Sequence, residues 1–222
     1  MAFDTALRVF LGCYFLFVAV HYSAWLIGLR QRHGRSRVRK DVLGSSNSLH
    51  QITFSAFRSL ILTVCLVRVV YPGLDEWVGA APGLNGLPVL NGTGAVLMLA
   101  AFGWIDYCKS YMDHNWASGT DADHLSGSKL LTSGPFSITR NPIFIGILVG
   151  QAGFMLAFPS AFTVICFGVG VATILRQSAI EELALRRRFG QRYLIYAEEV
   201  PRWFHLPSRS IVNLLTRSNR SD

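Results

Sequence analysis

The sequence predicts an all-α, polytopic membrane protein. Of its 222 residues, 51% are hydrophobic and 15% are charged, and the mean hydropathy is +0.35. Such a chain has too few charges to cover an ordinary soluble globule. Five apolar stretches are long enough, or nearly so, to cross about 30 Å of hydrocarbon as helices: residues 7–29, 52–71, 89–108, 143–158 and 161–175. Helices are expected because lipid cannot satisfy open strand edges.

The first and the last two stretches need separate interpretation. The stretch 7–29 is about twice as long as a signal-peptide core and has no basic segment ahead of it, so we expect a retained span. The stretches 143–158 and 161–175 are short, and only Pro159 and Ser160 separate them. They predict a tight helical hairpin that is tilted or crosses the bilayer incompletely.

The positions of the basic residues predict the orientation. The segment after the first stretch carries Arg30, Arg32, Arg35, Arg37, Arg39 and Lys40, whereas residues 72–88 carry no Lys or Arg. The positive-inside rule then places the N-terminus outside, and residues 109–140 and everything after 176 in the cytoplasm. We therefore expect a multi-pass protein of a bacterial inner membrane or an equivalent membrane, with its site facing the cytoplasm. The net charge of +8 lies on that face, so anionic lipid is the expected partner and nucleic acid is not.

Composition divides the chain near residue 109. Residues 1–108 hold three spans and a basic loop at 30–50, residues 109–205 hold a cytoplasmic segment, the hairpin and C-terminal helices, and residues 206–222 are predicted to be a mobile basic tail. In the second part, one helix is expected over 161–188 and another over 191–199. Gly190 is the interruption or C-cap between them, and Pro201 limits the second helix.

The segment 134–146, GPFSITRNPIFIG, is the strongest candidate for a binding site. Pro142 suits the first position of a helix, and the free N–H groups at a helix start, helped by Arg140, favour a carboxylate or phosphate. The alternative is that Asn141 merely caps the helix and that Arg140 anchors to lipid headgroups.

Two groups in the C-terminal region are further candidates. Glu181 and Glu182 can accept hydrogen bonds from ribose hydroxyls or offset a cationic ligand; the alternative is an exposed helix surface on which Glu182 pairs with Arg186. An aromatic and basic group can stack on adenine, wall a lipid tunnel or anchor at the membrane interface: Phe189, Tyr193, Tyr196, Arg202 and Trp203.

Other polar residues give weaker signals. Asp106 is a candidate for lining the site, with a helix-packing ion pair as the alternative. Arg58 and Arg68 should pair or reach an interface, because a charge at mid-bilayer costs about 2.5–3.5 kcal/mol, and Arg68 is placed to snorkel. The His and Asp residues of 111–124 match no familiar zinc or iron spacing, so no metal is predicted. The cysteines are interpreted as buried small hydrophobic residues: Cys13, Cys65, Cys108 and Cys166.

The second half of the chain contains an ordered series of motifs. The series consists of LLTSGPF at 130–136, TRNPIFIG at 139–146, Glu181-Glu182, Phe189-Gly190, Tyr193, Tyr196 and Val200-Pro201-Arg202. Over about residues 95–205, this series resembles the isoprenylcysteine carboxyl methyltransferase family, which includes phospholipid-methylating relatives. Asn141 stands where the family often has His, Phe144 where it often has Tyr, and Glu199 where prenylcysteine enzymes commonly have a basic residue.

The resemblance implies an integral membrane methyltransferase that uses S-adenosyl-L-methionine and a lipophilic acceptor arriving from the bilayer. It implies these cofactor-binding residues: Gly134, Pro135, Arg140, Asn141, Pro142, Ile143, Phe144, Gly146, Glu181, Glu182, Tyr193 and Tyr196. The candidate catalytic residues are Glu181, Glu182, Asp106 and Arg202. A carboxylate or thiolate acceptor needs no base, whereas an amine or hydroxyl needs one of these carboxylates with its pKa raised by burial.

Two other functions stay open. A membrane NADPH-dependent reductase of the sterol or steroid kind also carries an Arg-His-Pro-type motif near its C-terminus, although Asn141 replaces the His and this chain is short. A non-enzymatic membrane scaffold would use every motif as an interfacial anchor.

Overall fold

A computed structural model describes residues 2–33, 46–112 and 130–204, and within this part the chain is helical with no strand. The elements are α1 (Ala2–His33), α2 (Ser46–Val70), α3 (Leu74–Trp77), α4 (Pro88–Tyr111), η2 (Gly134–Ser137, a 3₁₀ turn), α5 (Pro142–Ala157), α6 (Ala161–Phe189) and α7 (Gln191–Glu199). The prediction of an all-α membrane protein is confirmed. Of the basic loop predicted at 30–50, residues 30–33 are the end of α1 and residues 46–50 the start of α2, and 34–45 lie outside the described residues. The His and Asp residues after 112 and the tail at 206–222 lie outside them too.

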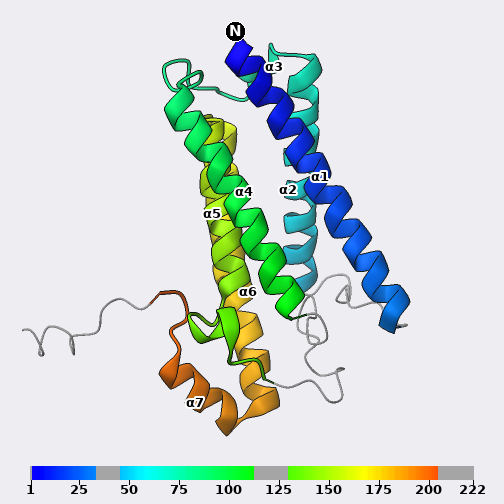
Figure 1. Cartoon of the computed structure of the whole chain (residues 1–222), viewed down its shortest axis with the longest axis vertical. Coiled ribbons are helices and arrows are strands. Elements are labelled where there is room, and N and C mark those ends of the chain that lie inside the picture. Colours follow the sequence, from blue (N-terminus) through cyan, green and yellow to red (C-terminus); the bar gives the residue numbers. More distant parts are fainter. Residues whose placement is uncertain (1, 34–45, 113–129, 205–222) are drawn as a thin grey trace, which may run out of the picture.

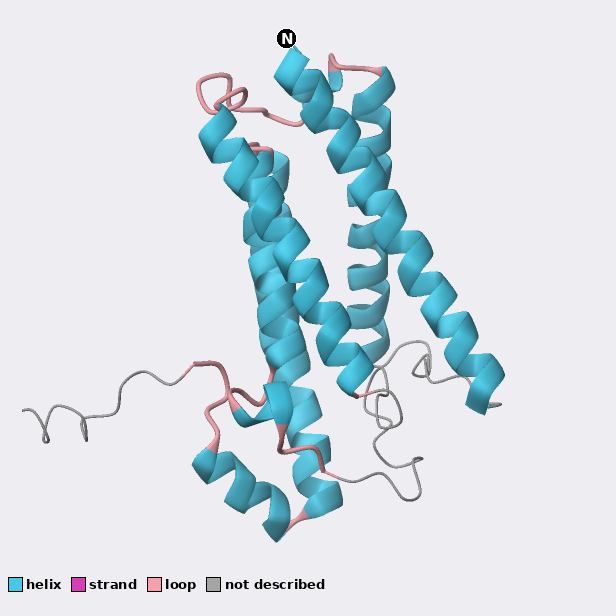
Figure 2. Cartoon of the chain, viewed as in Figure 1, coloured by secondary structure: helices cyan, strands magenta, loops and turns pink. Residues whose placement is uncertain are grey.

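The long helices form an elongated bundle (Figures 1 and 2). Helices α1 and α2 lie together on one side, and α4 and α5 form the closest pair on the other. Helix α6 runs back along α5 and extends beyond its start, and α7 folds back beside this extension (Figure 1). The α5 start, the α6 extension and α7 therefore meet at one end of the bundle.

Three described helices have the length and apolar composition to cross a membrane: Phe3–Trp25 within α1, Pro88–Tyr111 and Ala161–Phe189. Helix α5 has 16 residues, which at about 1.5 Å per residue is shorter than the hydrocarbon core. Five spans were predicted, and the fourth of them, α5, is too short to cross the hydrocarbon core completely. Helix α2 is not among the three, and its side chains at 46–55 lie outside the described part, so its crossing stays a prediction.

The hairpin of α5 and α6 has the sequence signals expected of it. Pro142 is the first residue of α5, and Ser160 begins α6 with a capping box in which its hydroxyl accepts from the Thr163 N–H. Gly190, at φ +53°, both ends α6 and precedes α7. The predicted bounds of the two C-terminal helices are confirmed to within one residue.

Glycines allow α4 and α5 to approach closely. A Cβ on Gly94 would meet the backbone of Gly153 and Ala157, and a Cβ on Gly146 would lie 2.7 Å from a side-chain carbon of Ile105. Small residues at helix contacts are typical of membrane bundles because they admit close backbone packing. The close α4–α5 pair fixes the start of α5.

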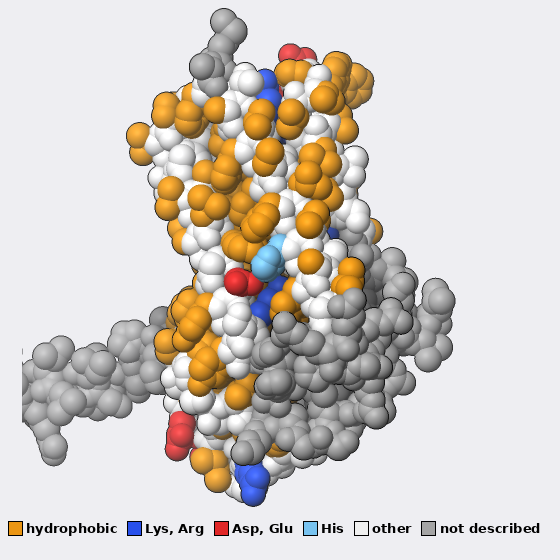
Figure 3. All heavy atoms as spheres, turned by 45° about the vertical axis from the view of Figure 1, so that its right-hand side comes forward, with side chains coloured by type: hydrophobic (Ala, Val, Ile, Leu, Met, Phe, Trp, Pro, Cys, Tyr) orange, Lys and Arg blue, Asp and Glu red, His pale blue; other side chains and the backbone are white. Residues whose placement is uncertain are grey.

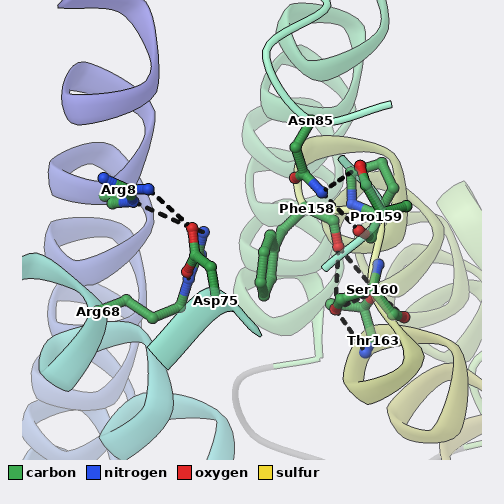
Figure 4. Close-up of polar contacts among 9 residues, drawn as sticks. Arg8, Arg68, Asp75, Asn85, Phe158, Pro159, Ser160 and Thr163 are labelled. Atoms are coloured by element: carbon green, nitrogen blue, oxygen red, sulfur yellow. Dashed lines mark hydrogen bonds and ion pairs between the residues drawn. The ribbon is translucent and has the colours of Figure 1, made fainter. Parts of the chain in front are cut away.

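At the opposite end of the bundle, Asp75 on α3 joins two arginines (Figure 4). It accepts from Arg68 Nε at 2.6 Å and from Arg8 Nη2 at 2.9 Å. Arg68 is 3% exposed, and its guanidinium carbon lies 3.3 Å from the Phe158 ring centroid. Arg68 pairs with a carboxylate, one of its two predicted outcomes, but it is buried rather than snorkelling. The arrangement ties α1, α2 and α3 to the α5–α6 hairpin.

Burial also corrects one expectation about the cysteines. Cys65, Cys108 and Cys166 are buried as predicted, but Cys13 is exposed on α1. Many large hydrophobic side chains are exposed too, among them Phe17, Val20 and Val96, and Figure 3 shows them covering much of the upper part of one face. Hydrocarbon is the medium that such a surface suits.

Candidate functional site

The segment before α5 is bonded to the chain that leaves α7. The Arg140 backbone N–H donates to the Pro201 carbonyl at 2.9 Å, and the Thr139 hydroxyl donates to the Arg202 carbonyl at 3.0 Å. Thr139 is 2% exposed. These bonds hold the irregular segment that follows α7 against the start of α5.

The Asn141 side chain does not cap α5. No side-chain capping bond is present at this position. Its amide nitrogen instead lies 3.1 Å from Glu182 Oε1 and 3.1 Å from the Arg202 carbonyl oxygen. The capping alternative for Asn141 is therefore wrong, and this buried amide connects α5, α6 and the segment after α7.

Glu182 is the centre of this polar network. It accepts from Arg202 Nε at 2.9 Å and lies 3.6 Å from Arg140 Nη1. The side chains of Glu182 and Arg140 are 17% and 16% exposed, so the charges are mostly withdrawn from solvent. Among the described residues Glu182 has no ion pair with Arg186, so the exposed i,i+4 pair weighed from the sequence does not form.

Two buried donors of the network have no partner among the described residues. They are Arg140 Nε and the Tyr193 hydroxyl. Burial and then the Glu182 carboxylate raise the pKa of Tyr193, and the nearby guanidinium groups of Arg140 and Arg202 offset part of this rise. The hydroxyl therefore stays protonated at neutral pH and can donate. An unsatisfied buried donor costs about 1–3 kcal/mol, so an acceptor group placed beside the two donors would be stabilised.

Tyr196 has a positional role beside the network. It is 5% exposed, and its hydroxyl donates to the Phe136 carbonyl of η2 at 2.7 Å. Gly134 begins η2 at φ +60°, and a Cβ there would lie 2.6 Å from the Tyr111 ring. Pro135 is buried in the same turn. These residues hold the segment that leads into Arg140.

Several predicted residues lie away from the network. Glu181 accepts from Gln177 Nε2 at 3.0 Å, one turn earlier on α6. Asp106 lies 2.9 Å from Nε2 of His21 on α1, so the helix-packing pair is the arrangement present. Gly146 serves the α4–α5 contact. Ile143 and Phe144 are half-buried in α5. The Pro142 carbonyl at the start of this helix accepts a hydrogen bond from the Trp104 indole N–H.

Four contributing groups were not assigned from the sequence. Thr139 stands inside the TRNP motif, so the motif itself held the signal for it. The Pro201 and Arg202 carbonyls act through the backbone, which leaves no residue-type signal. His21 gave no sequence signal because its partner is 85 residues away.

Comparison with known proteins bears on the family of the chain. Residues 88–192 match the model of a family described as phospholipid methyltransferase. Protein-S-isoprenylcysteine O-methyltransferase B of Arabidopsis thaliana is 23% identical over 208 residues, covering 89% of this chain and 93% of that protein. No solved structure matches. The comparisons confirm the resemblance and indicate a membrane methyltransferase: residues 88–192 are similar to the phospholipid methyltransferase family.

Proposed function

We propose that the protein is an S-adenosyl-L-methionine-dependent methyltransferase that acts on a lipophilic acceptor, with the polar end of the cofactor bound by the Glu182 network. The observation that carries this proposal is the pair of unsatisfied donors, Arg140 Nε and the Tyr193 hydroxyl, beside an otherwise paired carboxylate. The family match supports methyl transfer in general.

The residues present fit the charges of the cofactor's amino-acid end. Arg140 and Arg202 against Glu182 give a local charge of about +1, which suits one carboxylate group. Arg140 Nε and Tyr193 would donate to that carboxylate. Glu182 would accept from the ammonium or from a ribose hydroxyl, as the resemblance to the family implies.

When bound, S-adenosyl-L-methionine supplies a methyl group already activated by its positively charged sulfur. The chain's own part is to bind, to orient and to exclude water. Asn141 and Arg202 hold the Glu182 carboxylate in place, and the buried Thr139 and Tyr196 hold the backbone around it.

The one carboxylate within the described network is already engaged by neighbouring donors. Glu182 accepts from the Asn141 amide and from Arg202 Nε, and it lies 3.6 Å from Arg140 Nη1. Glu181 and Asp106 are engaged elsewhere. We therefore propose an acceptor that reacts as an anion, a carboxylate or a thiolate, on a molecule whose apolar part lies in the bilayer.

Titration of the detergent-solubilised full chain with S-adenosylhomocysteine and with NADPH tests the proposal. We expect the first to bind, with a calorimetric signal, and the second not to. Binding of NADPH alone would point to the reductase, and binding of neither would point to the scaffold. Incubation with methyl-labelled cofactor and a lipid extract should then label a lipid. Mild alkaline hydrolysis releases the label from a methyl ester, the product of a carboxylate, but not from a methyl thioether, the product of a thiolate.

A further inference from the structure

Three aromatic residues of α4 form a row beside the start of α5. Trp104, Tyr107 and Tyr111 follow one another at helical spacing, with 6.0 Å and 6.4 Å between successive ring centroids. Tyr107 and Tyr111 are 53% and 40% exposed, and Trp104 is half-buried. The row therefore lies on the side of α4 where the contact with α5 gives way to open surface.

Two of the three rings direct their polar ends into the protein. The Trp104 indole N–H donates to the Pro142 carbonyl at 2.9 Å, and the Tyr111 hydroxyl lies 2.8 Å from the Ser133 hydroxyl. An aromatic anchor at a membrane interface presents its polar end to headgroups and water. Anchoring alone therefore does not account for Trp104 and Tyr111.

The two bonds reach opposite ends of the segment 133–142. This segment carries Thr139, Arg140 and Asn141 of the Glu182 network, and its only regular element is the single turn η2. On its other side, the backbone N–H of Arg140 and the hydroxyl of Thr139 donate to the carbonyls of residues 201 and 202. A segment with so little regular structure is placed by such contacts, and α4 supplies one at each end.

Two glycines of the segment and of α5 make room for the two rings. Gly134 has a φ of +60°, and a Cβ there would lie 2.6 Å from the Tyr111 ring. A Cβ on Gly146 would lie 2.9 Å from the Trp104 ring. Real Cβ atoms do not come this close to a neighbour, so a larger residue at either position would displace the ring or the segment.

We propose that Trp104 and Tyr111 are positioning residues of the cofactor site, which fix the two ends of the segment 133–142 and so set where Arg140 lies against Glu182. Arg140 Nη1 is 3.6 Å from Glu182, and Arg140 Nε has no partner among the described residues. A small shift of the segment would move the donor that meets the cofactor's carboxylate. This proposal rests on the proposed function, because the cofactor is the ligand whose affinity the segment sets.

Calorimetric titration of the detergent-solubilised full chain with S-adenosylhomocysteine tests the role through two glycines of α5. Gly146→Ala displaces the Trp104 ring and should weaken binding about tenfold. Gly150→Ala, one turn further along the same contact with α4, places its Cβ 3.4 Å from the Ala101 Cβ and should bind within twofold of wild type. Trp104→Phe keeps a ring but removes the N–H, and it should weaken binding about fivefold.

A double-mutant cycle separates positioning from a general loss of stability. Tyr111→Phe and Ser133→Ala each remove one side of the same contact. Each should weaken S-adenosylhomocysteine binding about threefold, and the double variant should lose no more than either variant alone. Tyr107→Phe, which changes an exposed tyrosine of the same row, should bind as wild type does. Melting curves identify the variants that are folded at the titration temperature.

Two results would overturn the proposal. One is wild-type affinity in folded Gly146→Ala, Trp104→Phe and Tyr111→Phe, since a role in folding alone lowers the melting temperature and leaves the affinity unchanged. The other is an equal loss in the controls Gly150→Ala and Tyr107→Phe. If Gly146→Ala does not fold, Trp104→Phe and the cycle decide. Absence of binding to wild type would contradict the proposed function itself, and this proposal with it.

Discussion

The Asn141 amide nitrogen lies 3.1 Å from Glu182 Oε1 although the two residues are 41 positions apart. The α5–α6 hairpin brings them together, because α6 is 29 residues long and α5 only 16, so α6 passes beyond the start of its neighbour. The polar site is thus built on the part of α6 that α5 does not cover. Substitutions at this contact should affect ligand binding more than folding.

Replacement of Asn141 by Asp should weaken binding of S-adenosylhomocysteine by about 10- to 100-fold, the effect of losing a hydrogen bond to a charged group. The new carboxylate would face Glu182 and repel it. Asn141→His, the residue often found in the family, can still donate to Glu182 and should bind within tenfold of wild type. Calorimetric dissociation constants provide the comparison; equal losses in the two variants would refute the donor role.

The two adjacent glutamates provide a matched pair. Glu182→Gln removes the charge that Arg140 and Arg202 face and should weaken S-adenosylhomocysteine binding by about tenfold or more. Glu181→Gln changes a contact with Gln177 alone and should leave the affinity within about twofold of wild type. A larger loss of affinity in Glu181→Gln than in Glu182→Gln would show that Glu181, and not Glu182, faces the ligand.

The two tyrosines of α7 should separate stability from binding. Tyr196→Phe leaves the Phe136 carbonyl without its partner and should destabilise the fold by about 1–3 kcal/mol. Tyr193→Phe removes a hydroxyl that has no described partner, so it should keep the melting temperature but weaken ligand binding. Melting curves with and without S-adenosylhomocysteine measure both effects, and the opposite pattern would reverse the two roles.

The ion pairs of Asp75 with Arg68 and Arg8 should make the stability of the fold depend on pH. Burial by itself raises the pKa of Asp75, but hydrogen bonds from Arg68 and Arg8 outweigh it and lower the pKa below its ordinary 3.8. A carboxyl group whose pKa is lower in the folded state than in the unfolded state stabilises the fold at every pH above its unfolded-state pKa. This stabilisation is lost as the pH falls through the folded-state pKa. Near pH 7, Asp75→Asn should therefore be less stable by about 3 kcal/mol.

The difference between wild type and Asp75→Asn should stay constant from about pH 8 to pH 6 and shrink below about pH 4. Melting temperatures of the two proteins across this range measure it. Glu76→Gln, an exposed neighbour on α3, is the control and should match wild type. A difference between wild type and Asp75→Asn that grows on acidification would contradict the sign of the pKa shift.

The helices were predictable because their signals are local. Apolar length marks α1, α4 and α6, while Pro142, Gly190 and Pro201 mark where helices begin or end. The short α3 was missed, because it is a single turn held by contacts to other helices, such as the Asp75 bonds to Arg68 and Arg8.

The site was predictable only in part. The motifs located Arg140, Asn141 and the two glutamates, but the choice of Glu182 over Glu181 depends on the rotation of α6 against α5. Asp106 was assigned to the site because the sequence does not show that α1 lies on that face of α4. The burial of Arg68 likewise depends on Phe158, which is 90 positions away.

The affinity of Arg140→Ala for S-adenosylhomocysteine is the most direct test of the central claim. Arg140 supplies both a charge beside Glu182 and the unsatisfied Nε donor. We predict a loss of about 100-fold for Arg140→Ala and no change for Arg187→Ala, an exposed arginine of α6. Equal affinity in Arg140→Ala and wild type, with both proteins folded, would contradict the placement of the cofactor at the Glu182 network.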